Sequence, residues 1–242
     1  LDSIHGLRVN GKSVKLRGAC IHHDHGILGA ATYYDAEYRR IKKLKDAGFN
    51  AIRMAHNPAA PALLRACDEL GMYVMDEAFD MWTRPKKDND YSLFFDRWWR
   101  RDVTAMVEKN YNHPSVILYS LGNEIPEIGT PQGVTLSRKM ARLIRRLDST
   151  RYCLVSINGV FAAGDQVKSI LSDIFPQSPQ EKTDGDVNVF MADLDAHMDE
   201  IVRHPVISGL LENAETGLDA VGYNYMASRY EADAANYPNR IM

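Results

Sequence analysis

The chain has 242 residues, of which 45% are hydrophobic and 25% are charged, and its net charge is −3. Its basic runs are short, so it lacks the electrostatic footprint of a nucleic-acid-binding protein. The longest uncharged stretch, residues 152–164, is too short and too polar to cross a membrane. The length fits one large α/β domain, with neither nucleic acid nor membrane as a partner.

The first expected elements are a hairpin and a strand within residues 7–21. Asn10-Gly11 stands between two apolar arms, and this dipeptide accepts the positive φ angles of a type I′ turn. The second arm is expected to continue into a first strand at residues 19–21. Residues 1–18 are therefore predicted to form a hairpin that leads into strand one.

The rest of the chain alternates between short apolar runs and amphipathic segments. The expected strands are 50–54, 73–75, 115–120, 153–157 and 219–224, and the expected helices are 35–47, 61–70, 95–110, 136–147, 166–175, 189–203 and 226–235, with a polar turn at 181–185. This alternation predicts an α/β fold with a parallel sheet and helices outside it. We expect residues 1–242 to form an incomplete (β/α)8 TIM barrel with about six of its eight strand–helix units.

Catalytic side chains of such barrels lie at the carboxyl ends of the strands. Polar residues follow five of the expected strands: His22, His23, Asp24 and His25; Arg53, His56 and Asn57; Asp76, Glu77 and Trp82; Asn123 and Glu124; Asn224 and Tyr225. Convergence from five strands is hard to explain by solvated loops, and it predicts an active site on this face.

Glu124 is the strongest candidate for a catalytic residue, because the apolar strand before it places Asn123 and Glu124 at the barrel mouth. A carboxyl group there can protonate a glycosidic oxygen and later deprotonate water. The amide of Asn123 suits a sugar hydroxyl beside the breaking bond. The alternative is that the pair only caps a loop.

Two long segments resemble the signatures of glycoside hydrolase family 2. Residues 110–124 (Asn-Tyr-Asn-His-Pro-Ser-Val-Ile-Leu-Tyr-Ser-Leu-Gly-Asn-Glu) resemble its acid/base signature, and residues 50–58 followed by 68–77 resemble its other signature. The resemblance runs from about Val9 to the last residue. It implies a retaining exo-β-glycosidase that acts on a β-linked oligosaccharide or glycoside, with additional β-sandwich domains in a longer parent chain.

The resemblance also implies a role for individual residues. Glu124 would be the general acid/base, with Asn123 beside it on the sugar 2-hydroxyl. The implied substrate-binding residues are His22, Arg53, His56, Asn123 and Tyr225. β-Galactosidases, β-glucuronidases and β-mannosidases share these motifs, so a β-galactosidase-like activity is expected with the other two left open. Association of identical chains is also left open.

Two features depart from the family pattern. A retaining mechanism needs a second carboxylate about 5–5.5 Å from the first, and the family carries it at the end of strand seven. Residues 238–242 resemble the start of that strand. The nucleophile is therefore expected beyond residue 242, the chain alone is expected to be inactive, and the sheet is expected to leave two open edges. The family's bacterial β-galactosidase binds magnesium through a Glu and a His after strand three. Met81 and Thr83 stand at those positions, so no metal and no cofactor are expected.

Other readings compete at several positions. A His-x-His pair after strand one is typical of metal-dependent amidohydrolases, but Ser156 and Tyr225 stand where further ligands would be needed. A non-catalytic sugar-binding barrel is a further alternative. Trp82 is either a sugar-stacking platform or a packing residue. Asp76 and Glu77 either bind substrate or hold Arg53 in a buried network, and the network is favoured for Asp76. Packing roles are expected for Trp98, Trp99, Cys20, Cys67 and Cys153.

Overall fold

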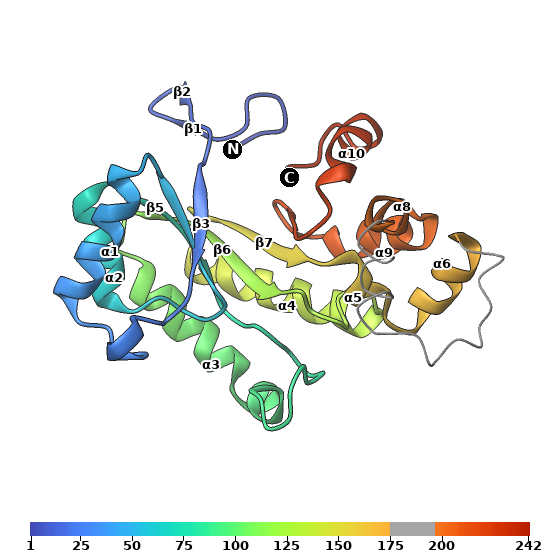
Figure 1. Ribbon diagram of the computed structural model, residues 1–242, viewed down its shortest axis with the longest axis horizontal. Helices are drawn as coiled ribbons and strands as arrows, with labels where there is room; N and C mark the ends of the chain where they lie inside the picture. The colour runs from blue at the N-terminus through green and yellow to red at the C-terminus, as the bar shows by residue number, and fades with distance from the viewer. Residues whose placement is uncertain (175–196) are drawn as a thin grey trace.

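The computed structural model describes residues 1–174 and 197–242. Its centre is a six-stranded parallel sheet in which the strands follow one another in sequence order, β3-β4-β5-β6-β7-β8 (Figure 1). The strands are β3 (Gly18–Ile21), β4 (Ala51–Met54), β5 (Tyr73–Glu77), β6 (Val116–Asn123), β7 (Tyr152–Ile157) and β8 (Gly222–Tyr223). This order confirms the predicted α/β fold: a parallel half-barrel, with β3 and β8 as its edges.

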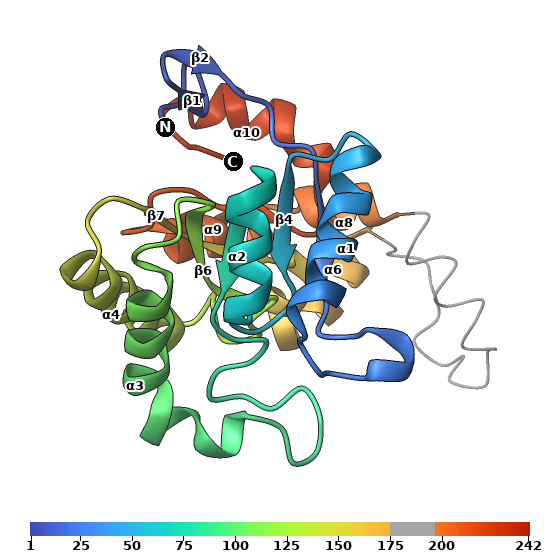
Figure 2. The ribbon, with the colours of Figure 1, turned by 90° about the vertical axis from the view of Figure 1, so that its left-hand side faces the viewer.

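Four helices follow the first strands and cover the outer face of the sheet. They are α1 (Tyr34–Asp46), α2 (Pro61–Leu70), α3 (Ser92–Asn110) and α4 (Pro131–Leu147). Helices α1 and α2 lie side by side, and α3 lies beside α4 (Figures 1 and 2). Among the described residues, no helix has the length and apolar character needed to cross a membrane.

Local sequence accounts for the ends of α2. Proline fixes a helical φ and lacks the N–H that a first helical turn leaves unpaired, and Pro61 occupies that position. Gly71 ends the helix in the left-handed conformation at φ 68°, and its N–H donates to the carbonyl oxygen of Cys67. Both ends agree with the expected range.

The N-terminal hairpin is present but short. Strands β1 (Arg8–Val9) and β2 (Lys12–Ser13) pair in antiparallel fashion, and Asn10 and Gly11 adopt φ angles of 51° and 78°, as a type I′ turn requires. The hairpin lies at the amino ends of the strands, close to the last residues of the chain (Figures 1 and 2).

The last residues run beside β8. The N–H of Val221 donates to the carbonyl oxygen of Ile241 at 2.9 Å, so residues near 241 lie at the edge of the sheet where a further strand was expected. That expected strand start is represented by a single hydrogen bond, and residues 238–242 have no assigned strand.

The region between β7 and β8 differs most from expectation. Helix α5 (Gly159–Ala163) and helix α9 (Pro205–Glu215) were not predicted, whereas α6 (Val167–Ile174) and α8 (Met198–Arg203) fall within expected helices. After β8, α10 (Tyr230–Asn236) overlaps the expected helix 226–235 and ends one residue beyond it. Pro205 at the first position of α9 was an available signal. The expected turn at 181–185, the last residue of the helix 166–175 and residues 189–196 of the next lie outside the described residues.

The two family-like signatures contact each other through buried and partly buried polar groups. Asp68 contacts the ring of His113 at 2.6 Å and accepts the N–H of Ser115 at 3.0 Å. Asp76 accepts from the amide of Asn110 at 2.7 Å. Much of each signature therefore joins α2 and β5 to the turn before β6, while other residues of the signatures reach the barrel mouth.

The expected packing role of Cys20 was wrong, because Cys20 is exposed, whereas Cys67 and Cys153 are buried as expected. Cys20 is paired in register with Arg53 on β4. Neighbouring residues in register point to the same side of a sheet, so Cys20 shares the inner face with Arg53. No described element covers that face at β3.

Candidate active site

Strand register decides which polar side chains reach the inner face. Arg53 is in register with Met75, and Glu77 is in register with Ser120. Because side chains alternate along a strand, Glu77 faces inward with Arg53 and Asp76 faces outward. The outward carboxylate of Asp76 accepts from the N–H of Ala59 at 2.8 Å and contacts groups on α3. The expectation that Asp76 partners Arg53 was therefore wrong, and Glu77 does so.

The carboxylate of Glu77 is the centre of the inner network, and it is fully buried. Arg53 donates from Nη2 to both carboxylate oxygens at 2.8 and 3.1 Å, and from Nε at 3.2 Å. The hydroxyl of Ser120 donates at 2.6 Å, and Nδ1 of His56 lies 2.6 Å away. Glu77 thus fixes the orientation of both Arg53 and His56.

Asn123 is buried and its amide is held at both ends. Its Oδ1 accepts from Nη2 of Arg53 at 2.8 Å and from Nδ2 of Asn224 at 3.0 Å. Its Nδ2 donates to Oδ1 of Asp80 at 2.9 Å. An amide has two acceptor lone pairs and two N–H donors, so these bonds leave one N–H for a ligand.

Glu124 lies directly after β6 and is half-buried at the mouth. Its Oε1 accepts from Nδ2 of Asn224 at 2.9 Å, and its backbone N–H donates to the carbonyl oxygen of Ser156 at 2.7 Å. Asn224 therefore bridges Glu124 and Asn123 from the end of β8. The structure brings Arg53, Asn123 and Glu124 into one hydrogen-bonded network, as expected for a shared site.

The histidines after β3 divide into two groups. The ring of His22 meets the ring of His56 edge-on, with centroids 5.3 Å apart, so these two expected site residues are neighbours. The ring of His25 contacts buried Glu37 on α1 at 2.9 Å, and His23 contacts the carbonyl oxygen of Pro58 at 3.2 Å. These contacts hold the loop to neighbouring elements.

Tyr225 stands apart from this network. Its side chain is 75% exposed and its backbone is left-handed at φ 59°. It follows Asn224, which reaches Glu124, so it borders the mouth without a hydrogen bond to the other expected site residues.

Of the two roles left open for Trp82, the structure shows the packing one, since the side chain is fully buried and presents no face for a sugar. Its Nε1 donates to the carbonyl oxygen of Leu121 at 3.0 Å, and its ring stacks near Phe95. The lack of a side chain at Gly122 makes room for it, because a Cβ there would lie 2.8 Å from the indole nitrogen. Trp99 is buried as expected, whereas Trp98 is only partly buried beside two arginines.

Two polar residues on the loop after β5 belong to the site but were not predicted. Asp80 accepts from the ammonium of Lys86 at 2.8 Å, and Lys86 also donates to the main-chain carbonyl oxygen of Asn123 at 2.8 Å. Burial of Asp80 opposes ionisation, but the bonds from Lys86 and Asn123 outweigh it and lower the pKa of Asp80 below its usual value. A lysine in a polar loop carries no sequence signal of this kind.

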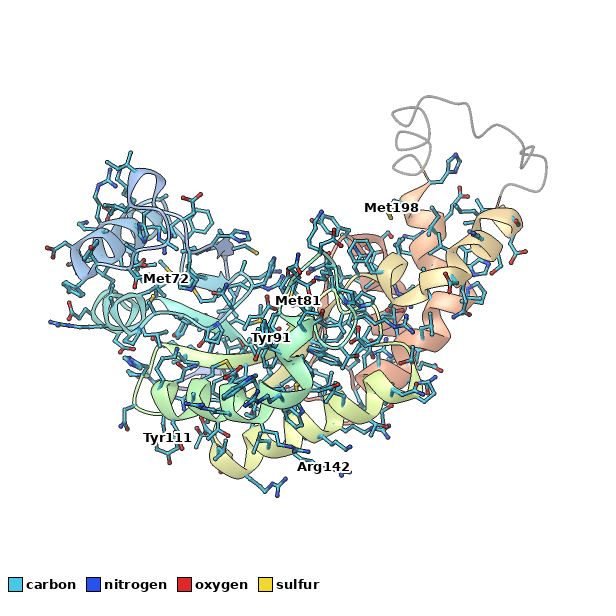
Figure 3. The ribbon with its side chains drawn as sticks, turned by 90° about the horizontal axis from the view of Figure 1, so that it is seen from below. Met72, Met81, Tyr91, Tyr111, Arg142 and Met198 are labelled. Carbon is cyan, nitrogen blue, oxygen red and sulfur yellow. The ribbon has the colours of Figure 1, made fainter. Side chains whose placement is uncertain are left out.

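A cavity of about 660 Å³ adjoins the site between this loop and α3. His56 and Asp80 line the side nearest the network, and Tyr91, Met106 and Lys109 line the side formed by α3 and its start. Met81 and Tyr91 mark its position in Figure 3.

The described residues contain no group of three or more His, Cys, Asp and Glu side chains arranged to hold a metal ion. At the two family metal positions, Met81 offers a thioether, and Thr83 uses both its N–H and its hydroxyl to donate to Glu127 at 2.7 and 2.8 Å. These groups do not fit a magnesium ion, which prefers carboxylate and water oxygens. That the site needs no metal stays a prediction.

A parallel sheet in sequence order, with ionisable side chains gathered at its carboxyl edge, defines part of the catalytic domain of a (β/α)8-barrel enzyme. The sequence matches the family described as "Glycosyl hydrolases family 2, TIM barrel domain" over residues 4–232. The chain belongs to that family.

Individual relatives agree with this assignment. A β-galactosidase from Bacteroides ovatus is 35% identical over 99% of this chain, which corresponds to 26% of that protein. The crystal structure of a glycosyl hydrolase family 2 member from Bacteroides cellulosilyticus has a TM-score of 0.76 and 38% identity, covering 99% of this chain and 25% of that one. A β-glucuronidase from Parabacteroides merdae has a TM-score of 0.56 and 27% identity over 65% of this chain and 20% of its own. This chain spans about a quarter of the length of the first two relatives.

Proposed function

We propose that the chain supplies the acid/base half of a retaining β-glycosidase site, with Glu124 as the general acid and base. The observation that carries the proposal is the anchoring of Glu124 by Asn224 beside the fixed amide of Asn123. Glu124 donates a proton to the glycosidic oxygen as the bond breaks, and then accepts one from the water that attacks the glycosyl intermediate.

The second carboxylate of this mechanism is proposed to come from residues after 242. The two inner carboxylates nearest the network are already paired with cations, Glu77 with Arg53 and Asp80 with Lys86. Glu77 is also fully buried with both oxygens engaged, so a sugar cannot reach it, and Oδ1 of Asp80 already accepts from both Lys86 and Asn123. The residues near Ile241 run along β8, so a strand continuing from them would enter the site next to Tyr225.

For the sugar, we propose a terminal β-linked neutral hexose, with galactose first. A uronic acid would need a cation for its carboxylate, and both cations of the described network, Arg53 and Lys86, are neutralised by buried or half-buried partners. The free N–H of Asn123 suits a hydroxyl oxygen, and His22 and His56 are proposed to contact further hydroxyls. The similarity to a β-galactosidase over almost the whole chain supports this choice.

The test is a panel of nitrophenyl β-glycosides (galactoside, glucoside, mannoside and glucuronide) hydrolysed by the protein expressed from its complete coding sequence. We expect the galactoside to be hydrolysed fastest. A preference for the glucuronide would contradict the neutral-sugar proposal. Binding of galactose without hydrolysis of any member would favour a sugar-binding barrel.

Glu124→Gln in the same protein tests the role of the acid/base. General acid catalysis contributes about 10²–10⁴ in rate, so hydrolysis of alkyl glycosides should fall by about that factor. Glycosylation by dinitrophenyl glycosides should fall much less, because such a leaving group needs little protonation. With the dinitrophenyl glycoside, azide should partly restore turnover and yield a β-glycosyl azide, because it attacks the glycosyl intermediate without needing a general base. Equal losses for both kinds of substrate in the glycosylation step would mean that Glu124 is not the acid.

A further inference from the structure

The peptide group between Asn123 and Glu124 is fixed at both of its polar atoms. The ammonium of Lys86 donates to its carbonyl oxygen at 2.8 Å, and its N–H donates to the carbonyl oxygen of Ser156 at 2.7 Å. Glu124 itself adopts φ 47°, in the left-handed region that a residue with a Cβ rarely enters. Such a conformation persists only where the surroundings hold it, and these two bonds hold the peptide that precedes it.

The position of Lys86 is built into the loop after β5. The carboxylate of Asp90 accepts the backbone N–H groups of Lys86 and Lys87 at 2.7 and 3.0 Å. Earlier in the loop, Glu127 accepts the N–H groups of Thr83 and Arg84 at 2.7 and 3.0 Å. The side chain of Lys86 is only 16% exposed, so the ammonium is directed inward from a backbone that is anchored on both sides.

The same ammonium also orients the amide beside the acid/base. Lys86 pairs with Asp80, and the oxygen of Asp80 that receives this bond accepts Nδ2 of Asn123 as well. One cation therefore sets both the plane of the peptide before Glu124 and, through Asp80, the direction of the Asn123 amide.

We propose that Lys86 is a positioning residue for the acid/base, a fixed cation that the loop after β5 places against the peptide before Glu124. The inference rests on the proposed role of Glu124. Lys86 orients the carboxyl group of Glu124 without touching the substrate.

The experiment compares Lys86→Ala, Lys86→Arg and the control Lys87→Ala in the complete protein. Lys87 is the exposed neighbour in the same loop, and its backbone N–H has the same partner. Loss of a hydrogen bond to a charged group predicts that kcat/KM of Lys86→Ala on alkyl glycosides falls by about 10- to 100-fold. Dinitrophenyl glycosides, which need no acid, should lose less than about threefold in the glycosylation step. Lys87→Ala should match the wild-type protein.

Chemical rescue separates positioning from a general loss of structure. The Lys86→Ala variant lacks the three carbons and the nitrogen that n-propylammonium supplies, so millimolar n-propylammonium should restore activity to this variant but not to Glu124→Gln. The arginine variant should recover only part, because a planar guanidinium does not replace a compact ammonium between two acceptors. Magnesium should have no effect on Lys86→Ala.

The outcomes separate the two proposals. If the wild-type protein hydrolyses no glycoside, the proposed function fails and this inference fails with it. If the wild-type protein is active and Glu124→Gln is not, but Lys86→Ala equals Lys87→Ala, only the Lys86 inference is overturned. Equal losses for alkyl and dinitrophenyl substrates, without rescue by the amine, would reduce Lys86 to a structural residue and would also overturn it.

Discussion

Replacing Glu77 with glutamine tests whether the buried carboxylate organises the inner face of the barrel. Glutamine keeps the shape of the side chain but has one acceptor oxygen, whereas Glu77 accepts with both oxygens from Arg53 and Ser120 and also contacts His56. Its amide nitrogen would therefore face another donor, and Arg53 would lose its counter-charge. Arg53 is only 13% exposed at its side chain, and Glu77 is fully buried.

Removing one partner from such a buried pair costs about 3–5 kcal/mol. A loss of about 3 kcal/mol corresponds to a change of about 100-fold in the local opening equilibrium, since ~1.4 kcal/mol is a factor of ten. Hydrogen exchange followed by mass spectrometry reports that equilibrium strand by strand. Peptides covering β4 and β5 should exchange about 100-fold faster in Glu77→Gln, while peptides from α4 should be unchanged.

Glu69→Gln is the matched control, because Glu69 also pairs with an arginine, Arg65, but on the exposed surface of α2. Exposed pairs contribute little to stability, so exchange in this variant should match the wild-type protein. If β4 and β5 in Glu77→Gln exchange within about threefold of wild type, the network around Glu77 does not organise this face, and Arg53 is held in place by other contacts.

Two further predictions concern stability. Burial raises the pKa of Glu215 to about 7 despite the ion pair with Arg240. The folded protein therefore holds this proton more tightly than the unfolded chain does. The contribution of Glu215 to stability is fully present below about pH 4.5 and is lost as the pH rises to about 7. The thermal midpoint of Glu215→Gln, relative to that of the wild-type protein, should therefore rise between about pH 5 and pH 8. A relative midpoint that falls over that range would contradict the raised pKa of Glu215. Gly122→Ala would place a Cβ 2.7 Å from Ile125 and 2.8 Å from Trp82. This overpacking should destabilise the protein by about 1–3 kcal/mol. An unchanged thermal midpoint would show that Trp82 does not pack against Gly122.

The sequence by itself determined the parallel α/β architecture and the position of Glu124, the proposed acid/base. Strand–helix alternation depends on local periodicity, and ends such as Pro61 and Gly71 are fixed by the backbone chemistry of single residues. The placement of Glu124 after β6 followed from a short apolar run, whose length favours a buried strand over a helix. These features are encoded within a few residues of where they act, so a single sequence is enough to predict them.

Tertiary structure alone decided which neighbours share a face and which polar groups meet. Asp76 and Glu77 are adjacent carboxylates, and only the register of β5 against β4 sends Glu77 inward and Asp76 toward α3. Trp82 follows the same strand but is buried, because Gly122, much later in the chain, leaves space for it. Lys86 reaches the main-chain carbonyl oxygen of Asn123, next to Glu124, from another loop. Each of these outcomes depends on contacts between residues that are far apart in the chain, and no local pattern records them.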